Sequence, residues 1–270
     1  MKRVFAILLI VALAGWSCTK DEIQNNGDTN SDTTGDTGND DTGNSTEANQ
    51  QPTGTSANDL LSADAFTKLY IELVYVEGFE PSQASIDNFV SFLEQRTFKP
   101  NGIEVETRAV SSPGTTSWSV QNLVQFEDNN RTAYNNNNEI AVWVFFANGQ
   151  SSANAGNSVV LGAAYRNTSF VIFEETIHGL SDSPLEPNRT VLESTVIMHE
   201  FGHILGLTNL GSPLQSPHED PTHPKHCDEE NCLMYWAIES GSGIDNLIGV
   251  SSAPGLDEQC IADLQANGGK

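Results

Sequence analysis

The stretch HEFGHILG at residues 199–206 constrains the fold of this chain more than any other. His199 and His203 stand four residues apart, so on a helix their rings lie one turn above each other on the same face. Two imidazoles placed in this way can bind one tetrahedral metal ion. The residues around them, such as Phe201 and Ile204, are apolar. We therefore expect a buried helix that contributes two ligands to a metal site.

Local signals predict where this helix begins and ends. Thr190 and Glu193 have the spacing of a capping box, in which each side chain accepts a hydrogen bond from the other residue's backbone N–H group. The helix should therefore begin near Val191. Gly206 can adopt the left-handed conformation that often follows a C-cap, so the helix should end near this residue.

Glu200 gives the expected metal site a chemical role. It stands next to the first histidine, and from there its carboxylate can reach a water on the metal without displacing that water. The general base of metal-assisted hydrolysis occupies this place. A purely structural metal site has no need of an acid at this position.

The motif resembles those of known zinc peptidases. HEFGHILG matches the HExxH motif of zincins, and Gly206 makes it similar to the metzincin form HExxHxxGxxH. The resemblance implies a zinc-dependent endopeptidase with an α+β fold. Such a fold has a mixed twisted sheet with helices, a methionine turn beneath the metal and a C-terminal helix. Here Cys232-Leu233-Met234-Tyr235 could form the turn, and residues 256–265 could form the helix.

The third zinc ligand is displaced from its usual position. Metzincin spacing places it at residue 209, but Asn209 has a neutral amide oxygen and is a poor zinc ligand. Three histidines, His218, His223 and His226, precede the candidate methionine turn. His226 is the preferred ligand, because His226-Cys227 and the CxxxxCxM spacing that begins there resemble the archaemetzincin pattern. His223 and His218 stay open as alternatives.

Three cysteines lie near this part of the chain. Archaemetzincins bind a second, structural zinc with the help of a later CxxC, but this chain has only Cys260 there, which leaves no four-cysteine site. An oxidising compartment would permit one disulfide and leave one thiol over. We expect Cys227 and Cys232 to form a small disulfide loop that holds His226 and Met234 in place.

Other assignments remain open at this stage. Tyr235 is a candidate for stabilising the transition state, since some metzincins use a tyrosine near the methionine turn. A glutamate could serve as third zinc ligand, as in gluzincins, and would be Glu219 or Glu239. Calcium is a further candidate cofactor, with oxygen ligands from the acids Glu219, Asp220, Asp228, Glu229 and Glu230. A closed site with four protein ligands would instead indicate a binding or adhesive surface lipoprotein with structural zinc.

The N-terminal residues indicate export and anchoring. Residues 1–17 contain two basic residues and an apolar run that is shorter than the roughly 20 residues of a membrane-spanning helix, so we expect a signal peptide. Cys18 follows, as in bacterial lipoprotein precursors, where this cysteine is acylated. The next residues, Thr19-Lys20-Asp21-Glu22, resemble the acidic export tag of some Gram-negative lipoproteins. We therefore expect an envelope lipoprotein at the outer membrane or cell surface.

Composition divides the rest of the chain and limits its partners. Residues 18–58 are mostly Asn, Asp, Thr, Gly and Ser, which predicts a flexible acidic tether before one catalytic domain at residues 59–270. The net charge of −24 argues against nucleic acid and anionic lipid surfaces as partners. Membrane contact is expected through the lipid on Cys18 alone. The expected partner of a monomeric chain is a protein or peptide substrate.

Hydrophobic patterns predict the sheet. Residues 68–77 and 102–110 read as strands, and residues 162–176 supply one or two more. Residues 82–96 and 119–134 have helical spacing. The run EIAVWVFFA at residues 139–147 is almost wholly apolar, which is typical of a central strand buried on both faces.

Overall fold

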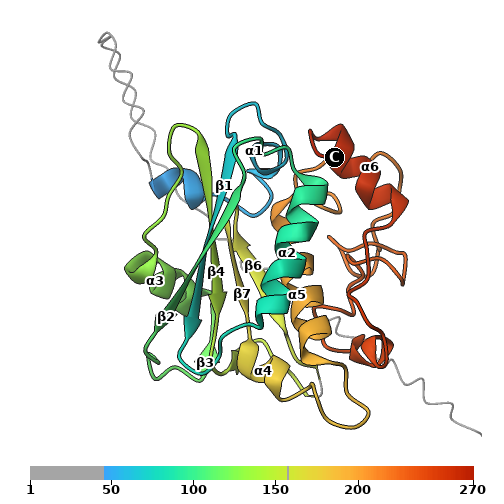
Figure 1. Ribbon diagram of the computed structural model, residues 1–270. Coiled ribbons are helices and arrows are strands. Elements are labelled where there is room, and N and C mark those ends of the chain that lie inside the picture. The colour runs from blue at the N-terminus through green and yellow to red at the C-terminus, as the bar shows by residue number, and fades with distance from the viewer. Residues whose placement is uncertain (1–45, 157) are drawn as a thin grey trace, which may run out of the picture. The chain divides into compact units, whose positions relative to one another are not determined.

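Five strands form a mixed, twisted sheet in the order β2-β1-β4-β7-β6 (Figure 1). The computed structural model describes residues 46–156 and 158–270, so the expected signal peptide, Cys18 and most of the expected tether lie outside the described residues. The parallel strands are β1 (Lys68–Val76), β2 (Ile103–Val110), β4 (Glu139–Phe146) and β7 (Ser169–Ile172). Strand β6 (Gly162–Arg166) pairs antiparallel with β7 at the edge of the sheet. A separate small pair joins β3 (Ser117–Trp118) to β5 (Gln150–Ser151).

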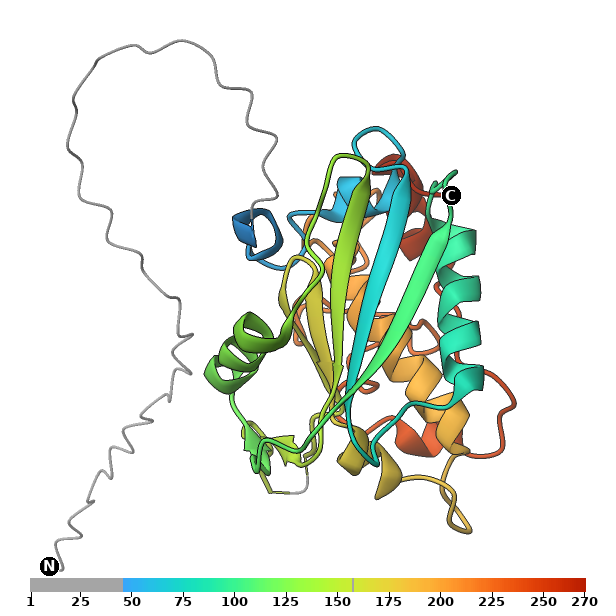
Figure 2. The same cartoon turned by 60° about the vertical axis from the view of Figure 1, so that its left-hand side comes forward.

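Helices cover both faces of this sheet, as Figures 1 and 2 show. One face carries α2 (Gln83–Arg96) and α5 (Arg189–Ile204), and the other carries α3 (Val120–Asn130). The shorter helices are α1 (Ala57–Leu61), α4 (Glu174–His178), α6 (Glu258–Ala266) and the 3₁₀ helices η1 (Thr46–Asn49) and η2 (Ile244–Leu247). The predicted α+β fold, with a mixed sheet between helices, is confirmed. Among the described residues no helix has both the length and the hydropathy that a membrane crossing requires.

The central strand β4 is buried on both sides, as its apolar run predicts. Val142 and Val144 belong to the core between the sheet and helices α2 and α5. Trp143 and Phe145 point into the second core, under α3. A strand without a solvent-facing side needs no alternation of polar residues, which explains its composition.

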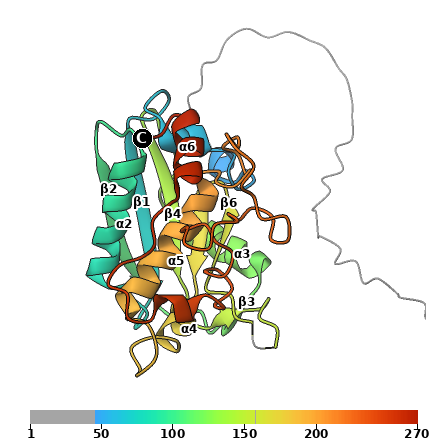
Figure 3. The ribbon, with the colours of Figure 1, turned by 90° about the vertical axis from the view of Figure 1, so that its right-hand side faces the viewer.

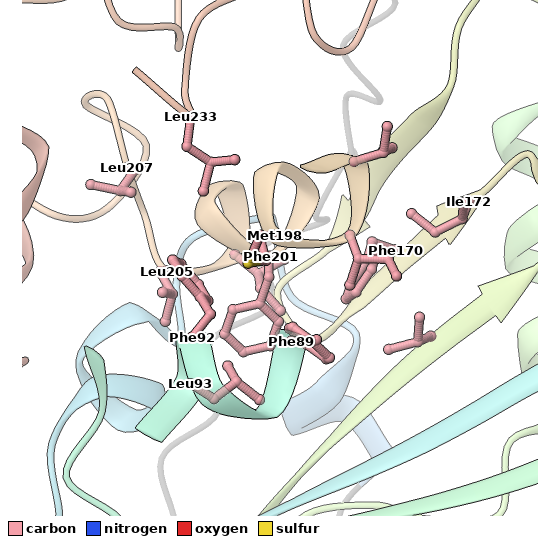
Figure 4. Packing of buried hydrophobic residues seen from close by; sticks show 14 of the residues in the cluster. Phe89, Phe92, Leu93, Phe170, Ile172, Met198, Phe201, Leu205, Leu207 and Leu233 are labelled. Atoms are coloured by element: carbon pink, nitrogen blue, oxygen red, sulfur yellow. The ribbon is translucent and has the colours of Figure 1, made fainter. Parts of the chain in front are cut away.

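Helix α5 packs against α2 and the sheet through aromatic contacts. The Phe201 ring lies 5.2 Å from that of Phe89 on α2 and 6.2 Å from that of Phe170 on β7, centroid to centroid, both edge to face. Figure 4 shows these three rings together beneath the helix. Because Phe201 lies between the two metal-site histidines in sequence, this packing fixes the face on which His199 and His203 stand.

The start of α5 differs from the predicted capping box. The N-cap is Asn188, whose side chain accepts the Val191 N–H at 3.3 Å. The Glu193 carboxylate instead turns toward α2, where it accepts the Ser82 N–H at 3.0 Å and the Ser85 hydroxyl at 2.5 Å. The buried acid therefore joins two helices rather than closing one, and the capping-box prediction is wrong.

The packed part of the chain begins before the predicted boundary at Asp59. Asn49 in η1 is fully buried, and its amide donates to Asn135 Oδ1 at 2.8 Å and to the Ala141 carbonyl at 3.0 Å. Residues 46–58, which composition assigns to the tether, thus belong to the domain. Side-chain amides rather than apolar residues hold this segment, and a pattern based on apolar content does not detect such contacts.

The aromatic packing under α5 has a measurable energy. Replacing Phe201 by alanine should lower the free energy of unfolding by about 3–5 kcal/mol, since it removes a large side chain from a closed core. Phe98, which is 47% exposed, provides the control, and Phe98→Ala should cost less than about 0.5 kcal/mol. Urea denaturation followed by circular dichroism compares the two, and equal losses would contradict this description of the core.

Candidate metal centre

Three histidines and one glutamate meet above α5. Ligand atoms of His199, His203, His226 and Glu239 all lie within 4.8 Å of one another. The ring of His226 stands 5.4 Å from that of His199 and 5.1 Å from that of His203, centroid to centroid. The structure thus brings the preferred third histidine to the two on the helix.

The surroundings of the imidazoles suit metal binding. His199 Nδ1 donates to the Leu233 carbonyl at 2.7 Å, and His226 Nδ1 lies 3.2 Å from the Pro224 carbonyl. Carbonyls in this place fix the ring orientation of metal-bound histidines and leave Nε2 for the metal. Burial and the neighbouring His199 lower the pKa of His203 to about 4, against an opposing effect of Glu239. His203 is therefore neutral near pH 7, the form that binds metals.

A long loop delivers His226 to the site. Helix α5 ends at Ile204, and Gly206 has the expected left-handed conformation, with φ of 78°. The chain then leaves the site, so Asn209 is exposed and its amide donates to Glu219 Oε2 at 3.1 Å. It returns where the Thr208 hydroxyl donates to the Lys225 carbonyl. This return places residue 226 where metzincin spacing would place residue 209.

The methionine turn lies against the same helix. Met234 is fully buried, and a Cβ atom on Gly202 would stand 2.3 Å from its sulfur. A side chain at residue 202 would therefore force the buried Met234 side chain to shift. Figure 3 shows the segment that follows α5 passing over this helix on its way to α6.

Glu200 is buried beside the histidines. Neither of its carboxylate oxygens, nor His199 Nε2, has a hydrogen-bond partner among the described residues. Burial raises the pKa of the Glu200 carboxyl well above its ordinary value, and the Glu239 carboxylate adds to this effect. A Cβ atom on Gly162 would lie 2.7 Å from Glu200 Oε1, so β6 passes directly over the acid. Buried polar atoms without partners fit a site that holds a metal ion and a water.

Glu239, which the sequence offered only as a substitute for the third histidine, is the fourth member of this group. Its Oε2 lies 3.0 Å from His226 Nε2, 3.5 Å from His203 Nε2 and 3.7 Å from His199 Nε2. Burial alone would raise the pKa of this carboxyl, but the three imidazoles hold it well below its usual range. Glu239 thus joins three histidines as a fourth group, rather than replacing one of them as a gluzincin glutamate would.

A second group of ligand type lies between the loop and α6. It contains His218, Cys227, Asp257 and Cys260, and the sulfur of Cys232 is 3.6 Å from that of Cys260. His218 Nδ1 lies 3.5 Å from Cys227 Sγ and 3.9 Å from Cys260 Sγ. Tetrahedral zinc with sulfur ligands at about 2.3 Å separates its ligand atoms by about 3.8 Å. These donors and separations are those of a structural zinc site.

The second group replaces the expected disulfide. Cys227 and Cys232 are free thiols in this structure, as is Cys260. The Cys232 sulfur accepts the N–H groups of Met234 and Asp257, each at 3.4 Å, and so turns toward α6. Hydrogen bonds from Cys227 and Cys260 lower its pKa to about 4, which favours the thiolate.

His218 supplies the ligand that sequence reasoning missed. Its Nε2 lies 2.8 Å from Asp263 Oδ2 on α6, and both residues are buried. This contact orients Nδ1 toward the sulfurs, as a carboxylate commonly does for a metal-bound histidine. His218 stands nine residues before Cys227, but the sequence suggested it only as an alternative ligand for the three-histidine centre, because its partners Cys260 and Asp263 lie more than forty residues later.

The remaining candidates are not among the ligands of the three-histidine centre. The His223 ring stacks on Trp236 at 4.0 Å between centroids, and its Nδ1 lies 2.7 Å from Asp220 Oδ2. Tyr235 lines a neighbouring cavity of about 450 Å³. Among the described residues, no ligand group gathers the five acids considered for calcium, Glu219, Asp220, Asp228, Glu229 and Glu230.

A third group of possible ligands already contacts the guanidinium of Arg189. Glu174, His178 and Glu193 lie together where α4 meets α5. Arg189 fills the space between them, with Nε 3.0 Å from Glu193 Oε1 and Nη1 2.9 Å from His178 Nε2. This group therefore stabilises the start of α5 and offers no free site for a metal.

Comparison with known proteins agrees with this geometry. Residues 97–208 match the model of the reprolysin-like metallopeptidase family M12B. The matched segment runs through the HEFGHILG helix and stops short of His226. It supports a zinc metallopeptidase of the metzincin-like type. The comparison with curated proteins found no match.

Two solved structures resemble the chain at low sequence identity. An archaemetzincin from Methanopyrus kandleri is 19% identical, with a TM-score of 0.49, over 76% of this chain and 96% of its own. Metalloproteinase-II from Bacteroides fragilis is 14% identical, with a TM-score of 0.41, over 76% of this chain and 54% of its own.

The two ligand groups predict the metal content. The wild-type protein should contain about two zinc ions per chain, and His218→Ala and Cys260→Ala should each contain about one. His223→Ala is the control and should retain both, since its ring stacks on Trp236 outside either group. Elemental analysis measures these contents, and a single zinc in all four proteins would refute the second site.

Proposed function

We propose that this protein is a zinc-dependent endopeptidase anchored in a bacterial envelope. The observation that carries the proposal is the convergence of His199, His203 and His226 beside a buried, unpartnered Glu200. Three imidazoles and one nearby acid are the donor set of a catalytic zinc site. The family match over residues 97–208 supports the same activity.

The bound zinc would polarise the scissile carbonyl and activate a water. Glu200 takes the proton from that water during attack and returns it to the leaving amine. Burial suits this role, because a carboxylate with a raised pKa is a stronger base. His199 keeps its orientation through the Leu233 carbonyl, so the geometry persists as charge develops.

The edge of the sheet offers a place for the substrate. Strand β6 is the last strand on its side and passes over Glu200 at Gly162. An extended peptide can add to such an edge through backbone hydrogen bonds, which bind without demanding one sequence. A peptide bond placed there lies next to the three histidines.

One observation favours a second function. Glu239 takes the fourth place around the three imidazoles, which would give a closed site of the structural kind. On that interpretation the protein is a binding or adhesive surface lipoprotein. Glu200 argues for the enzyme, because a closed structural site gains nothing from a buried acid that no other side chain pairs with.

Site-directed variants test the peptidase proposal. Glu200→Gln should keep its zinc but lose about 10²–10⁴-fold in kcat, because the proton acceptor is gone. His226→Ala should lose the zinc of this centre, while His223→Ala should bind and cleave as wild type does. Zinc analysis and cleavage of a mixed peptide library measure both properties. An active Glu200→Gln variant would refute the proposed role of the acid.

The anchoring proposal has its own test. Wild-type protein should partition with membranes through acylated Cys18, whereas Cys18→Ala should appear in the soluble fraction, since one or more acyl chains supply the membrane affinity. Cys260→Ala is the thiol control and should remain with the membranes. Fractionation with metabolic labelling by a fatty-acid analogue measures this, and unlabelled wild type would exclude the lipoprotein.

A further inference from the structure

Glu239 occupies the position of a fourth metal ligand. Tetrahedral zinc with nitrogen and oxygen ligands at about 2.0–2.1 Å separates neighbouring ligand atoms by about 3.3 Å. The distances from Glu239 Oε2 to the three Nε2 atoms, 3.0, 3.5 and 3.7 Å, lie on both sides of this value. One carboxylate oxygen is therefore placed where a water and the substrate carbonyl would have to bind.

We infer that Glu239 is a displaceable cap on the zinc centre, which holds the peptidase latent until residues 237–243 move aside. The inference rests on the proposed function, since latency has meaning only for an enzyme. We refer to residues 237–243 as the strap. The strap begins one residue after the methionine turn, beyond Trp236, and carries Glu239 near its middle.

The strap is joined to the opposite side of the substrate path. The Leu161 N–H, directly before β6, donates to the Glu239 carbonyl at 3.0 Å. This hydrogen bond uses a backbone group next to the edge that an extended peptide would need. Glu239 therefore competes with a substrate twice, through its side chain at the zinc position and through its carbonyl at the strand.

The contacts of Glu239 suit a ligand that can leave. Its side chain is 34% exposed, whereas those of His199, His203 and His226 are 0%, 7% and 13% exposed. His199 and His226 are oriented by backbone carbonyls, and His199 and His203 by the packing of α5. Among the described residues, the polar contacts of the Glu239 carboxylate are with the three imidazoles alone. A ligand without support of its own is the first to exchange.

Two glycines allow the strap to move. Gly241 has φ of 68°, a conformation that other residues rarely adopt, and a Cβ atom there would meet Val159 at 2.6 Å. Gly243 closes the strap through its N–H bond to the Ala237 carbonyl at 2.9 Å. Hinges are commonly a few residues that absorb a change of φ and ψ, and glycine does so at low cost.

The test compares full-length, zinc-loaded wild type with Glu239→Gln and Glu239→Ala. Acetohydroxamate, a small zinc-binding probe, is titrated by calorimetry, and the cobalt-substituted proteins are compared by visible absorption. Both variants should bind the probe about tenfold more tightly or better, because capped wild-type molecules cannot accept it. Their cobalt spectra should change with the loss of a carboxylate ligand, and their peptide cleavage should rise by a similar factor. Glu230→Gln, an exposed acid on the neighbouring loop, should match wild type in all three measurements.

The outcomes separate this inference from the proposed function. Tighter probe binding with a changed spectrum but no cleavage by any protein supports the cap and refutes the peptidase. Cleavage by wild type, with unchanged probe affinity and spectrum in the variants, supports the peptidase and overturns the cap. Loss of this zinc in both Glu239 variants also overturns the cap, since it would make Glu239 a permanent structural ligand.

Discussion

The hydrogen bond from His199 to the Leu233 carbonyl is the contact on which the metal centre depends. It joins helix α5 to a turn more than thirty positions later, and both partners are buried. Close approach is possible because Gly202 has no side chain where Met234 packs. If the turn moved away, His199 would lose the carbonyl that orients its ring. The segment that carries His226 would also lose the hydrogen bond between the Cys227 N–H and the Met234 carbonyl. Helix and turn therefore form one structural unit.

The sequence predicted those parts of the structure that follow from local patterns. The strands at residues 68–77 and 139–147 are predictable because their β-branched, aromatic and apolar side chains are typical of buried strands. The pairing of His199 with His203 followed from helix geometry alone. The start of α5 was predicted from Thr190 and Glu193, but a distant partner on α2 takes the Glu193 carboxylate instead.

Features that depend on distant contacts could not be read from the sequence. Glu239 reaches the histidines because a turn brings it back over α5, and no spacing rule connects residues 203 and 239. His218 meets the cysteines through Asp263, near the C-terminus. Asn49 looked like part of a polar tether because its stabilising contacts are hydrogen bonds to residues far along the chain. In each case the contact forms only in the folded chain, between residues far apart in sequence.

The bond between the Thr208 hydroxyl and the Lys225 carbonyl has a consequence for how such a site can vary. It closes the chain between residues 208 and 225 into a loop whose two ends are fixed beside the metal centre. The entropy of closing a loop rises slowly with its length, so residues can be added at its exposed positions at small cost, provided that His218 keeps its contacts with Cys227 and Asp263. His226, which directly follows Lys225, then keeps its position at the metal centre while the length of the preceding loop changes. The same chemistry can thus persist in chains whose spacing no longer matches a motif.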